Sequence, residues 1–288
     1  MRGRRAGWII VADGTRDVAQ GATDAGRREA LPHRSSPEVT PVMGVAAVLD
    51  SGRSRPDRVG AGRPCWSTCD VDDGLALRLL LIVMAYVIGS IPVGVLVARQ
   101  TGGPDPRTIG SGRTGGTNAL RALGRKWAAV VVTGDLLKGI LPVLAARLLT
   151  GDAVFEVVCA GAAVVGSARS VFLKFGGGRG VGTGVGTMLV IQPITVFLAA
   201  PVFIGVILIT RYVSLGSLLG SAAMFPAMVL LWAVWSGAVP PAYLVWAAVG
   251  PALIWLAHAD NIDRLIHGQE RKFDLDLLGG GGRGSPQG

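Results

Sequence analysis

Residues 75–98 read LALRLLLIVMAYVIGSIPVGVLVA, and this apolar run decides the fold. A transmembrane helix needs about 20 consecutive, mainly apolar residues to cross the hydrocarbon core of a bilayer. The run is long enough, and its single charged side chain is Arg78, near its start. Gly89, Ser90, Pro92 and Gly94 permit a kink and close packing against a neighbouring helix. The sequence therefore predicts that this stretch is a transmembrane helix.

Six further apolar runs follow, separated by short polar loops. The chain has 288 residues, of which 50% are hydrophobic and 16% charged, and its mean hydropathy is +0.49. Soluble domains average about 25% charged residues. We therefore predict an all-α, polytopic integral membrane protein with about seven transmembrane helices. The runs at 181–191 and 194–210 are two short spans or one broken hairpin. The six runs cover residues 127–149, 153–166, 181–191, 194–210, 218–235 and 243–256.

Lysine and arginine are unevenly distributed between the loops. They cluster at 99–126, at 168–180, at Arg211 and in the C-terminal tail, whereas the other loops carry none. With about seven spans, all the basic loops fall on one side, which the positive-inside rule assigns to the cytoplasm. This bias, together with contact with anionic membrane lipids, explains the net charge of +9. The sequence has no basic helix with interleaved aromatic residues, so we expect no nucleic-acid partner.

The two ends of the chain flank the predicted membrane domain, residues 75–273. Residues 1–74 are rich in Arg, Gly, Pro and Asp and show no sustained period. We interpret them as a disordered extension, or as an upstream extension from a mis-assigned start codon. Residues 274–288 are predicted to be a flexible glycine-rich tail. Cys65 and Cys69 have no second pair and no histidine nearby, so neither a metal site nor a redox cofactor is predicted.

A glycine-rich loop, GSGRTGGTNALRALG at residues 110–124, follows the first span. Glycines let backbone N–H groups converge on an anion, and a helix that starts near Asn118 would add a partial positive charge. Arg121, about one turn later, could hold phosphate oxygens in two parallel hydrogen bonds. The alternative is a flexible loop whose arginines face lipid. The candidate anion-binding residues are Gly110, Ser111, Gly112, Thr117, Asn118 and Arg121.

A second glycine-rich stretch, VFLKFGGGRGVGTGVG at residues 171–186, combines mobile amides with two cations at the mouth of a span. Its candidate binding residues are Lys174, Gly177, Gly178 and Arg179. Close helix packing explains the later glycines, Gly182, Gly184 and Gly186.

Three smaller groups of polar residues complete the pattern. Asp135 and Lys138 lie one helical turn apart within a span, where charges usually pair, so they form an ion pair or contact substrate. The stretch RYVSLGS contains Ser214 and Ser217. His258 and Asn261 share a helix face where the last span ends, which makes His258 a general-base candidate, although a lone histidine is more often structural. Glu270 follows in the tail.

The stretches GSIPVGVL, GSGRTGGTNALRALG, DLLKG, VFLKFGGGRGVGT, RYVSLGS and H-x-x-NIDRLIHGQE occur in this order over about residues 77–273. In this the chain resembles the PlsY-type acyl-phosphate:glycerol-3-phosphate acyltransferases. The resemblance implies an integral enzyme of the bacterial inner membrane with its active site at the cytoplasmic face. It also implies transfer of a fatty acyl group from acyl phosphate to the 1-hydroxyl of glycerol 3-phosphate. The products would be lysophosphatidic acid and phosphate, the first step of bacterial phospholipid synthesis.

The resemblance extends to single residues. Ser111 and Arg121 match the family's essential serine and arginine in the first loop, and Arg179 replaces the lysine of a GGKG motif in the loop assigned to glycerol 3-phosphate. Ser214 and Ser217 fall in the third motif, and His258, Asn261 and Glu270 match the tail motif. The chain differs from the usual pattern at four further positions: Arg113 and Gly116 replace Asn and Ala, and Ser167 and Ser170 stand in place of His and Pro.

The resemblance suggests a mechanism without a cofactor, because acyl phosphate is already activated and the enzyme must mainly position groups and neutralise charge. Arg121 and Arg179 would hold the two phosphates and Ser111 the reacting groups. Either His258, oriented by Asn261, or a substrate phosphate would accept the proton. A functional link to the soluble enzyme that forms acyl phosphate is also implied. The alternatives are a divergent inactive paralogue and a small-anion or lipid transporter, which predicts internal repeats that the sequence lacks.

Overall fold

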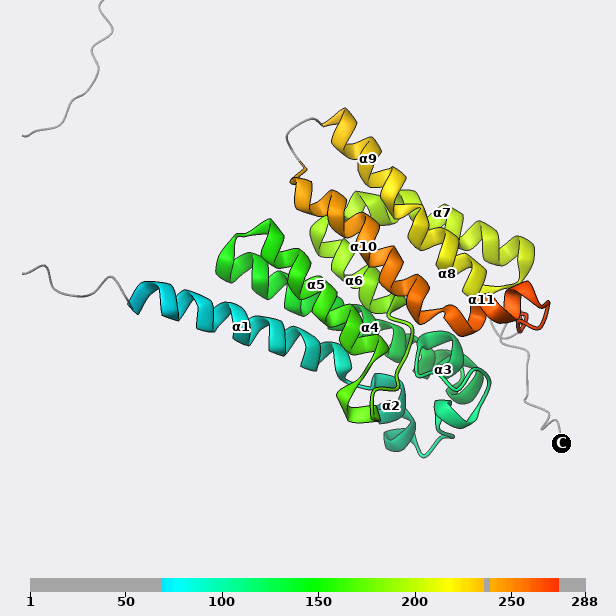
Figure 1. Ribbon diagram of the computed structural model, residues 1–288. Coiled ribbons are helices and arrows are strands. Elements are labelled where there is room, and N and C mark those ends of the chain that lie inside the picture. The colour runs from blue at the N-terminus through cyan, green and yellow to red at the C-terminus, as the bar shows by residue number, and fades with distance from the viewer. Residues whose placement is uncertain (1–68, 236–238, 275–288) are drawn as a thin grey trace, which may run out of the picture. The chain divides into compact units, whose positions relative to one another are not determined.

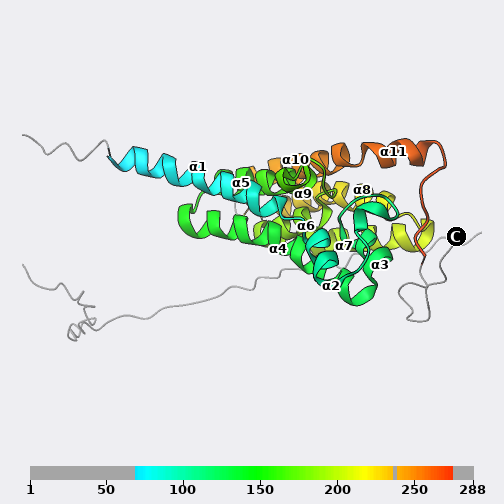
Figure 2. The same cartoon turned by 90° about the horizontal axis from the view of Figure 1, so that it is seen from below.

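The computed structural model describes residues 69–235 and 239–274, with side chains from Gly74 onward, and they fall within one compact unit, residues 63–288. These residues form helices and turns without a strand, which confirms the all-α prediction (Figures 1 and 2). The proposed extension and tail lie outside the described residues, apart from their innermost few. The helices are α1 Cys69–Ser90, α2 Val93–Thr101, η1 Pro106–Thr108, α3 Gly116–Leu123, α4 Arg125–Thr150, α5 Ala153–Ala168, η2 Val171–Leu173, α6 Val181–Ile191, α7 Pro193–Thr210, α8 Val213–Ala222, α9 Met224–Val234, α10 Pro241–Ala257 and α11 Ala259–Ile266.

The membrane spans follow the predicted apolar runs closely. Within the described residues, four helical stretches are long and apolar enough to cross a membrane, or up to six if each of two bent helix pairs is one span. The short apolar helix α6 accounts for the remaining run. The expected number of about seven is therefore approximate. The first helix also starts earlier than predicted, at Cys69 and not at Leu75.

The first span is bent by 45° between α1 and α2. Pro92 lies in the break, and the carbonyl groups before it are capped by side chains from elsewhere in the chain. The Ser170 hydroxyl donates to the Ser90 carbonyl oxygen at 2.5 Å, and Lys138 Nζ donates to the Ile91 carbonyl oxygen at 3.1 Å. These two bonds fix α2, and with it the start of the following loop, against α4 and the end of α5.

Helices α4 and α6 pack through their glycines. A Cβ atom on Gly139 would collide with the Thr183 carbonyl oxygen, and one on Gly186 would collide with the Leu136 carbonyl oxygen. This close approach agrees with the packing role predicted for Gly186. It seats the start of α6, and the glycine-rich loop before it, against the middle of α4.

The outer surface of the bundle is apolar, as lipid requires. Ile209 on α7 is 83% exposed, Phe197 on the same helix 70% and Leu256 on α10 73%. Inside the bundle, Trp246 and Met228 are almost fully buried in a core that α4, α5, α6, α7, α9 and α10 share. A surface that faces water would not expose so many large apolar side chains, and four to six helical stretches are long and apolar enough to cross a membrane, so the chain is a multi-pass membrane protein.

A buried ionic cluster joins four helices at the opposite end of the bundle from α3 and α11. We call Arg147, Glu156 and Tyr243 the far-end network. Arg147 Nη2 donates to Glu156 Oε2 at 2.8 Å, and its Nη1 donates to the Val190 carbonyl oxygen at 2.7 Å. The Tyr243 hydroxyl donates to Glu156 Oε2 at 2.9 Å. The network thus ties the last turns of α4 and α6 to the first turns of α5 and α10.

Candidate functional site

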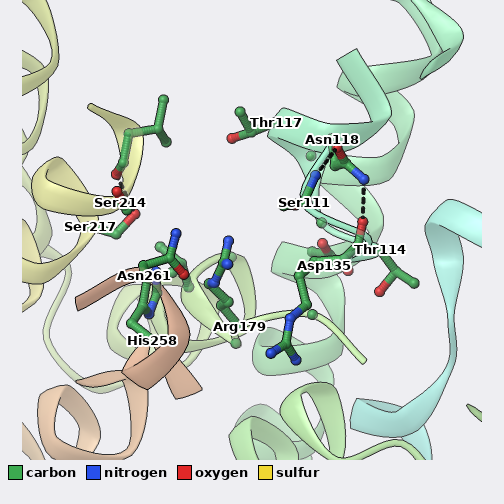
Figure 3. A pocket seen from close by; sticks show the side chains of 18 of the residues that line it. Ser111, Thr114, Thr117, Asn118, Asp135, Arg179, Ser214, Ser217, His258 and Asn261 are labelled. Carbon is green, nitrogen blue, oxygen red and sulfur yellow. Dashed lines mark hydrogen bonds between the residues drawn. The ribbon is translucent and has the colours of Figure 1, made fainter. Parts of the chain in front are cut away.

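A cavity of about 430 Å³ lies where α3, α8 and the α10–α11 junction meet the start of α6. Figure 3 shows Ser111 and Asn118 on one side, Ser214, Ser217, His258 and Asn261 on the other, and Arg179 between them. The lining holds six cationic side chains and two carboxylates, an excess that suits an anionic ligand. The cations are Arg113, Arg121, Lys138, Arg179, Arg264 and Arg271, and the carboxylates are Asp135 and Glu270.

The first loop is held in shape by Asn118, which is 3% exposed. Its Nδ2 donates to the carbonyl oxygens of Ile109 and Arg113 at 2.9 and 2.8 Å, and also to that of Pro106. Its Oδ1 accepts the Ser111 backbone N–H at 3.2 Å. Asn118 was predicted to bind substrate. Its amide bonds to the loop itself, which places Ser111 at the cavity, and binding of substrate by Asn118 remains a prediction.

Helix α3 begins at Gly116, two residues before the predicted start, and presents Arg121 to the cavity. The N-cap residue Gly115 carries no side chain, so no side chain caps the backbone N–H groups of Gly116 and Thr117, and both residues line the cavity. Arg121 makes no ion pair or hydrogen bond within the described residues. Burial, together with the nearby charge of Arg271, lowers its pKa below the ordinary value, although arginine stays charged at neutral pH.

The glycine-rich loop before α6 lies beside the first loop and brings Arg179 to the cavity. The Gly178 N–H donates to the Ser167 carbonyl oxygen at 3.0 Å, and the Ser170 N–H donates to the Gly176 carbonyl oxygen at 2.8 Å. Arg179 Nη2 pairs with Asp260 at 3.2 Å, while its buried Nε has no partner within the described residues. An unused N–H of a buried guanidinium is a site at which an anion would bind.

Asp260 on α11 gathers three arginines from three parts of the chain. Its Oδ2 lies 3.2 Å from Arg179, 3.4 Å from Arg113 and 3.5 Å from Arg264. Burial alone would raise the pKa of Asp260, but these three charges outweigh it and hold the pKa below its ordinary value. Asp260 therefore stays ionised and links both loops to α11.

His258 lies just past the last span, where α10 and α11 meet at 67°, and it is 1% exposed. Its Nδ1 lies 2.8 Å from the Ile254 carbonyl oxygen. Because a carbonyl oxygen can only accept, Nδ1 carries the hydrogen and Nε2 keeps a lone pair. Burial lowers the pKa of His258 to about 4, against the smaller opposing effect of the bond to Ile254, so the ring is neutral at neutral pH.

Three polar groups near His258 complete this side of the cavity. Asn261 Nδ2 donates to Glu270 Oε1 at 2.7 Å, which leaves its buried Oδ1 without a partner within the described residues. The Ser214 hydroxyl is also buried and without a hydrogen bond there, whereas the Ser217 hydroxyl donates to the Val213 carbonyl oxygen at 2.9 Å. Asn261 Oδ1 is therefore free to accept a hydrogen bond from a hydroxyl group of a ligand, whereas the Ser214 hydroxyl lies close enough to Glu270 to help lower the pKa of that carboxyl.

The ion pair in α4 forms part of the cavity wall. Lys138 Nζ lies 2.7 Å from Asp135 Oδ1 and also caps Ile91, so both its contacts are structural. Asp135 and Lys138 nevertheless line the cavity, where the pair supports the start of α6.

Most of the predicted site residues come together, but three do not line the cavity: Gly112, Lys174 and Gly177. Lys174 is exposed and adopts a left-handed conformation with φ of 52°. Gly112, with φ of 67°, and Gly177, which packs against the Ser167 carbonyl oxygen, shape their loops. Any role of these three in binding substrate remains a prediction.

An apolar pocket of about 230 Å³ adjoins the cationic cavity. Val181, Phe203 and Ser217 line both, so the two spaces meet at the ends of α6 and α8. From there the pocket runs between α6, α7, α8 and α10 toward Met188, Met224 and Trp246. The combined site has one strongly cationic part and one part that suits a hydrocarbon chain.

Known proteins resemble the chain over most of this region. The profile of the glycerol-3-phosphate acyltransferase family matches residues 79–268. The chain belongs to this family. It is 40% identical over 212 residues to glycerol-3-phosphate acyltransferase 3 of Dehalococcoides mccartyi, which covers 69% of this chain and 97% of the relative. It is 41% identical over 206 residues to glycerol-3-phosphate acyltransferase of Rubrobacter xylanophilus, covering 71% of this chain and 100% of the relative.

Two solved structures of PlsY (YgiH), an integral membrane glycerol 3-phosphate acyltransferase, have the same fold. One is the glycerol 3-phosphate form and the other the lysophosphatidic acid form. Their TM-scores are 0.63 and 0.62, and each is 36% identical over 70% of this chain and 98% of the other. The chain is therefore an integral membrane acyltransferase, which excludes the transporter hypothesis.

Membership of the family was expected, but two charged residues were not: Asp260, which pairs with arginines of the cavity lining, and Arg271, which lines the cavity. Asp260 and Arg264 stand four residues apart on α11, and this helical spacing could have indicated their pairing. No local pattern pointed to Arg271, which lines the cavity because the tail folds back toward it.

Proposed function

We propose that the chain transfers a fatty acyl group from acyl phosphate to the 1-hydroxyl of glycerol 3-phosphate, giving lysophosphatidic acid and inorganic phosphate. The observation that supports this most directly is the joining of the two cavities. The cationic cavity suits phosphoryl groups, and the adjoining apolar pocket suits an acyl chain. Both substrates are phosphorylated and only one carries an acyl chain, so the composition of the site fits this pair.

In the proposed reaction, the oxygen of the 1-hydroxyl forms a bond to the acyl carbon, and the bond from that carbon to the phosphate oxygen breaks. Phosphate leaves with the electron pair. Arg121 and Arg179 neutralise the two phosphoryl groups, and the uncapped backbone N–H groups of Gly116 and Thr117 at the start of α3 bind the developing negative charge. Because phosphate is a good leaving group, positioning supplies most of the acceleration.

His258 is the proposed proton acceptor. Its Nε2 is unprotonated and lies in the cavity lining. A dianionic substrate beside it would raise its low pKa toward neutrality, which makes it a stronger base in the complex than in the free enzyme. The proton finally resides on the released phosphate. A substrate phosphate oxygen is the competing acceptor.

One histidine–aspartate spacing in the chain bears on whether the acyl donor is a thioester or acyl phosphate. His258 and Asp263 stand five positions apart, in the H-x-x-x-x-D spacing typical of acyltransferases that use soluble thioester donors. In this fold the two side chains separate. Asp263 is 74% exposed and lies 3.4 Å from His267, whereas His258 is buried and bonded to Ile254. The dyad is not formed, which supports acyl phosphate as the donor.

We further propose that the site faces the cytoplasm of a bacterial inner membrane. The loops that build the cavity are the arginine-rich ones, and the positive-inside rule keeps such loops on the cytoplasmic side. A soluble enzyme that forms acyl phosphate could then deliver the donor on this side.

The proposed function is tested with purified protein in detergent, incubated with palmitoyl phosphate and glycerol 3-phosphate, while phosphate release and lysophosphatidic acid are both measured. The expected result is equal formation of the two products, with palmitoyl-CoA a poor donor. Equal or faster turnover with palmitoyl-CoA would overturn the donor assignment. A lack of turnover with either donor, in protein that is folded, would identify an inactive paralogue.

A further inference from the structure

Two of the six cations in the cavity lining have no carboxylate partner within the described residues. Lys138 pairs with Asp135, Arg264 with Glu270, and Arg113 and Arg179 with Asp260. Arg121 and Arg271 remain, and neither makes an ion pair or a hydrogen bond within residues 74–235 and 239–274. Their charges are therefore the ones most available to a ligand.

Arg271 belongs to the chain segment after α11 and is held at the cavity from both sides. Immediately before it, Glu270 accepts hydrogen bonds from Asn261 at 2.7 Å and from Arg264 Nε at 2.9 Å. Two residues after it, the buried Phe273 donates its backbone N–H to the Arg211 carbonyl oxygen at 2.6 Å. These contacts fix the backbone of Arg271, so its guanidinium need not be ordered from a free tail when a ligand binds.

Arg121 and Arg271 line the same cavity. Burial is the larger cause of the lowered pKa of Arg121 and the positive charge of Arg271 is the second, while the charge of Glu270 acts in the opposite direction. Two guanidinium groups that repel in the empty cavity would both be stabilised by a phosphoryl dianion between them, because each can donate two parallel N–H groups to its oxygens. The proximity of the two guanidinium groups is therefore electrostatically unfavourable in the empty cavity and becomes favourable when an anion binds between them.

We propose that Arg121 and Arg271 together bind one substrate phosphoryl group, so that Arg271 is a substrate-binding residue supplied by the tail. The family profile ends at residue 268, before Arg271, and no motif in the sequence includes it. The proposal rests on the proposed function, which supplies the two phosphorylated substrates. Arg179, with its free Nε on the other side of the cavity, is left for the second phosphoryl group.

The test compares Arg271→Gln with the neighbouring variant Lys272→Gln. Lys272 is exposed, carries the same charge and does not line the cavity. Binding of glycerol 3-phosphate, and separately of inorganic phosphate, is measured by calorimetry with the full chain in detergent. KM for both substrates is measured from phosphate release. We expect Arg271→Gln to weaken binding, or to raise one KM, by about tenfold or more, the loss typical of hydrogen bonds to charged groups, and Lys272→Gln to change neither. The substrate whose KM rises is the source of the phosphoryl group.

Two further measurements separate binding from a structural role. If Arg271 repels Arg121 in the empty cavity, ligand-free Arg271→Gln melts at the same temperature as the wild type or higher, whereas loss of a structural contact would lower it. In the double variant Arg121→Gln, Arg271→Gln, the loss of affinity should be smaller than the product of the single losses, since both residues hold one group. Binding and KM unchanged in Arg271→Gln, or a lowered melting temperature that accounts for the loss, would overturn the proposal.

Failure of the proposed function would look different. Wild-type protein that binds phosphate but does not turn over would contradict the acyltransfer reaction, and the effect of Arg271→Gln on phosphate binding would still decide whether the two arginines act together.

Discussion

Replacing Arg121 by alanine should abolish turnover, while replacing Arg113 by asparagine should not. Arg121 is half-buried and has no partner within the described residues, so its whole hydrogen-bonding capacity is available to a phosphoryl group. Truncating one side of a charge-assisted pair in a partly desolvated site costs roughly 2–5 kcal/mol. Taking about 3 kcal/mol, the expected loss in rate is on the order of a hundredfold or more.

Arg113 differs from Arg121 because its charge is already paired with a carboxylate. Its ion pair with Asp260 is 3.4 Å long, and about a third of each side chain is exposed, at 31% and 35%. Such pairs contribute about 0–1 kcal/mol, and Asp260 keeps Arg179 and Arg264, so Arg113→Asn should lose less than about fivefold in rate. The assay is the initial rate of phosphate release at matched expression in membranes. If Arg113→Asn is inactive and Arg121→Ala is near normal, the phosphate site is centred on Arg113 and the reasoning fails.

Three further results are expected. His258→Asn should lower kcat about a hundredfold or more and leave KM for glycerol 3-phosphate nearly unchanged, measured by phosphate release; a loss below threefold would assign the proton to a substrate phosphate. Gly186→Ala should lower the melting temperature by several degrees, because its Cβ collides with the Leu136 backbone, whereas Gly205→Ala, with open space around it, should not; equal effects would contradict the packing account. Burial would raise the pKa of Glu270, but hydrogen bonds from Asn261 and Arg264 hold the pKa below its ordinary value of 4.5. The ionised Glu270 side chain therefore stabilises the fold fully above pH 4.5, and this stabilisation is lost as the pH falls through the lowered pKa. Glu270→Gln should therefore melt lower at pH 7 and lose less stability between pH 5 and 3; an acid-induced loss equal to that of the wild type would refute this.

The sequence predicts the spans well because apolar length is a local property. The runs at 153–166, 181–191 and 243–256 match α5, α6 and α10 to within about two residues at each end. The bend at Pro92 was also visible in the residues that permit a kink. The number of spans was less certain, because a bent pair and a short apolar helix can each be counted in more than one way.

The candidate site was predicted in part, and the features that the sequence did not reveal share one cause. Motif position identified Arg121, Arg179 and His258 as residues of one site, but it could not show which polar atoms are already engaged. The side-chain amide of Asn118 could bind a ligand, but it makes its hydrogen bonds to its own loop. Arg271 looks like an ordinary tail residue until Glu270 and Phe273 fix the segment on either side of it. Contacts between residues far apart in the chain decide both cases, and no local pattern contains them.

The far-end network limits how the bundle can move. Rocking the helices apart at that end would separate Arg147 from Glu156, whose side chain is 4% exposed. The Arg147 side chain is 36% exposed, so separating the pair costs less than the roughly 3–5 kcal/mol of a fully buried one, but it leaves the buried Glu156 carboxylate without its charged partner. The same movement would also release the Val190 carbonyl at the end of α6. The far-end network therefore opposes alternating access, in which a binding site opens first to one side of a membrane and then to the other.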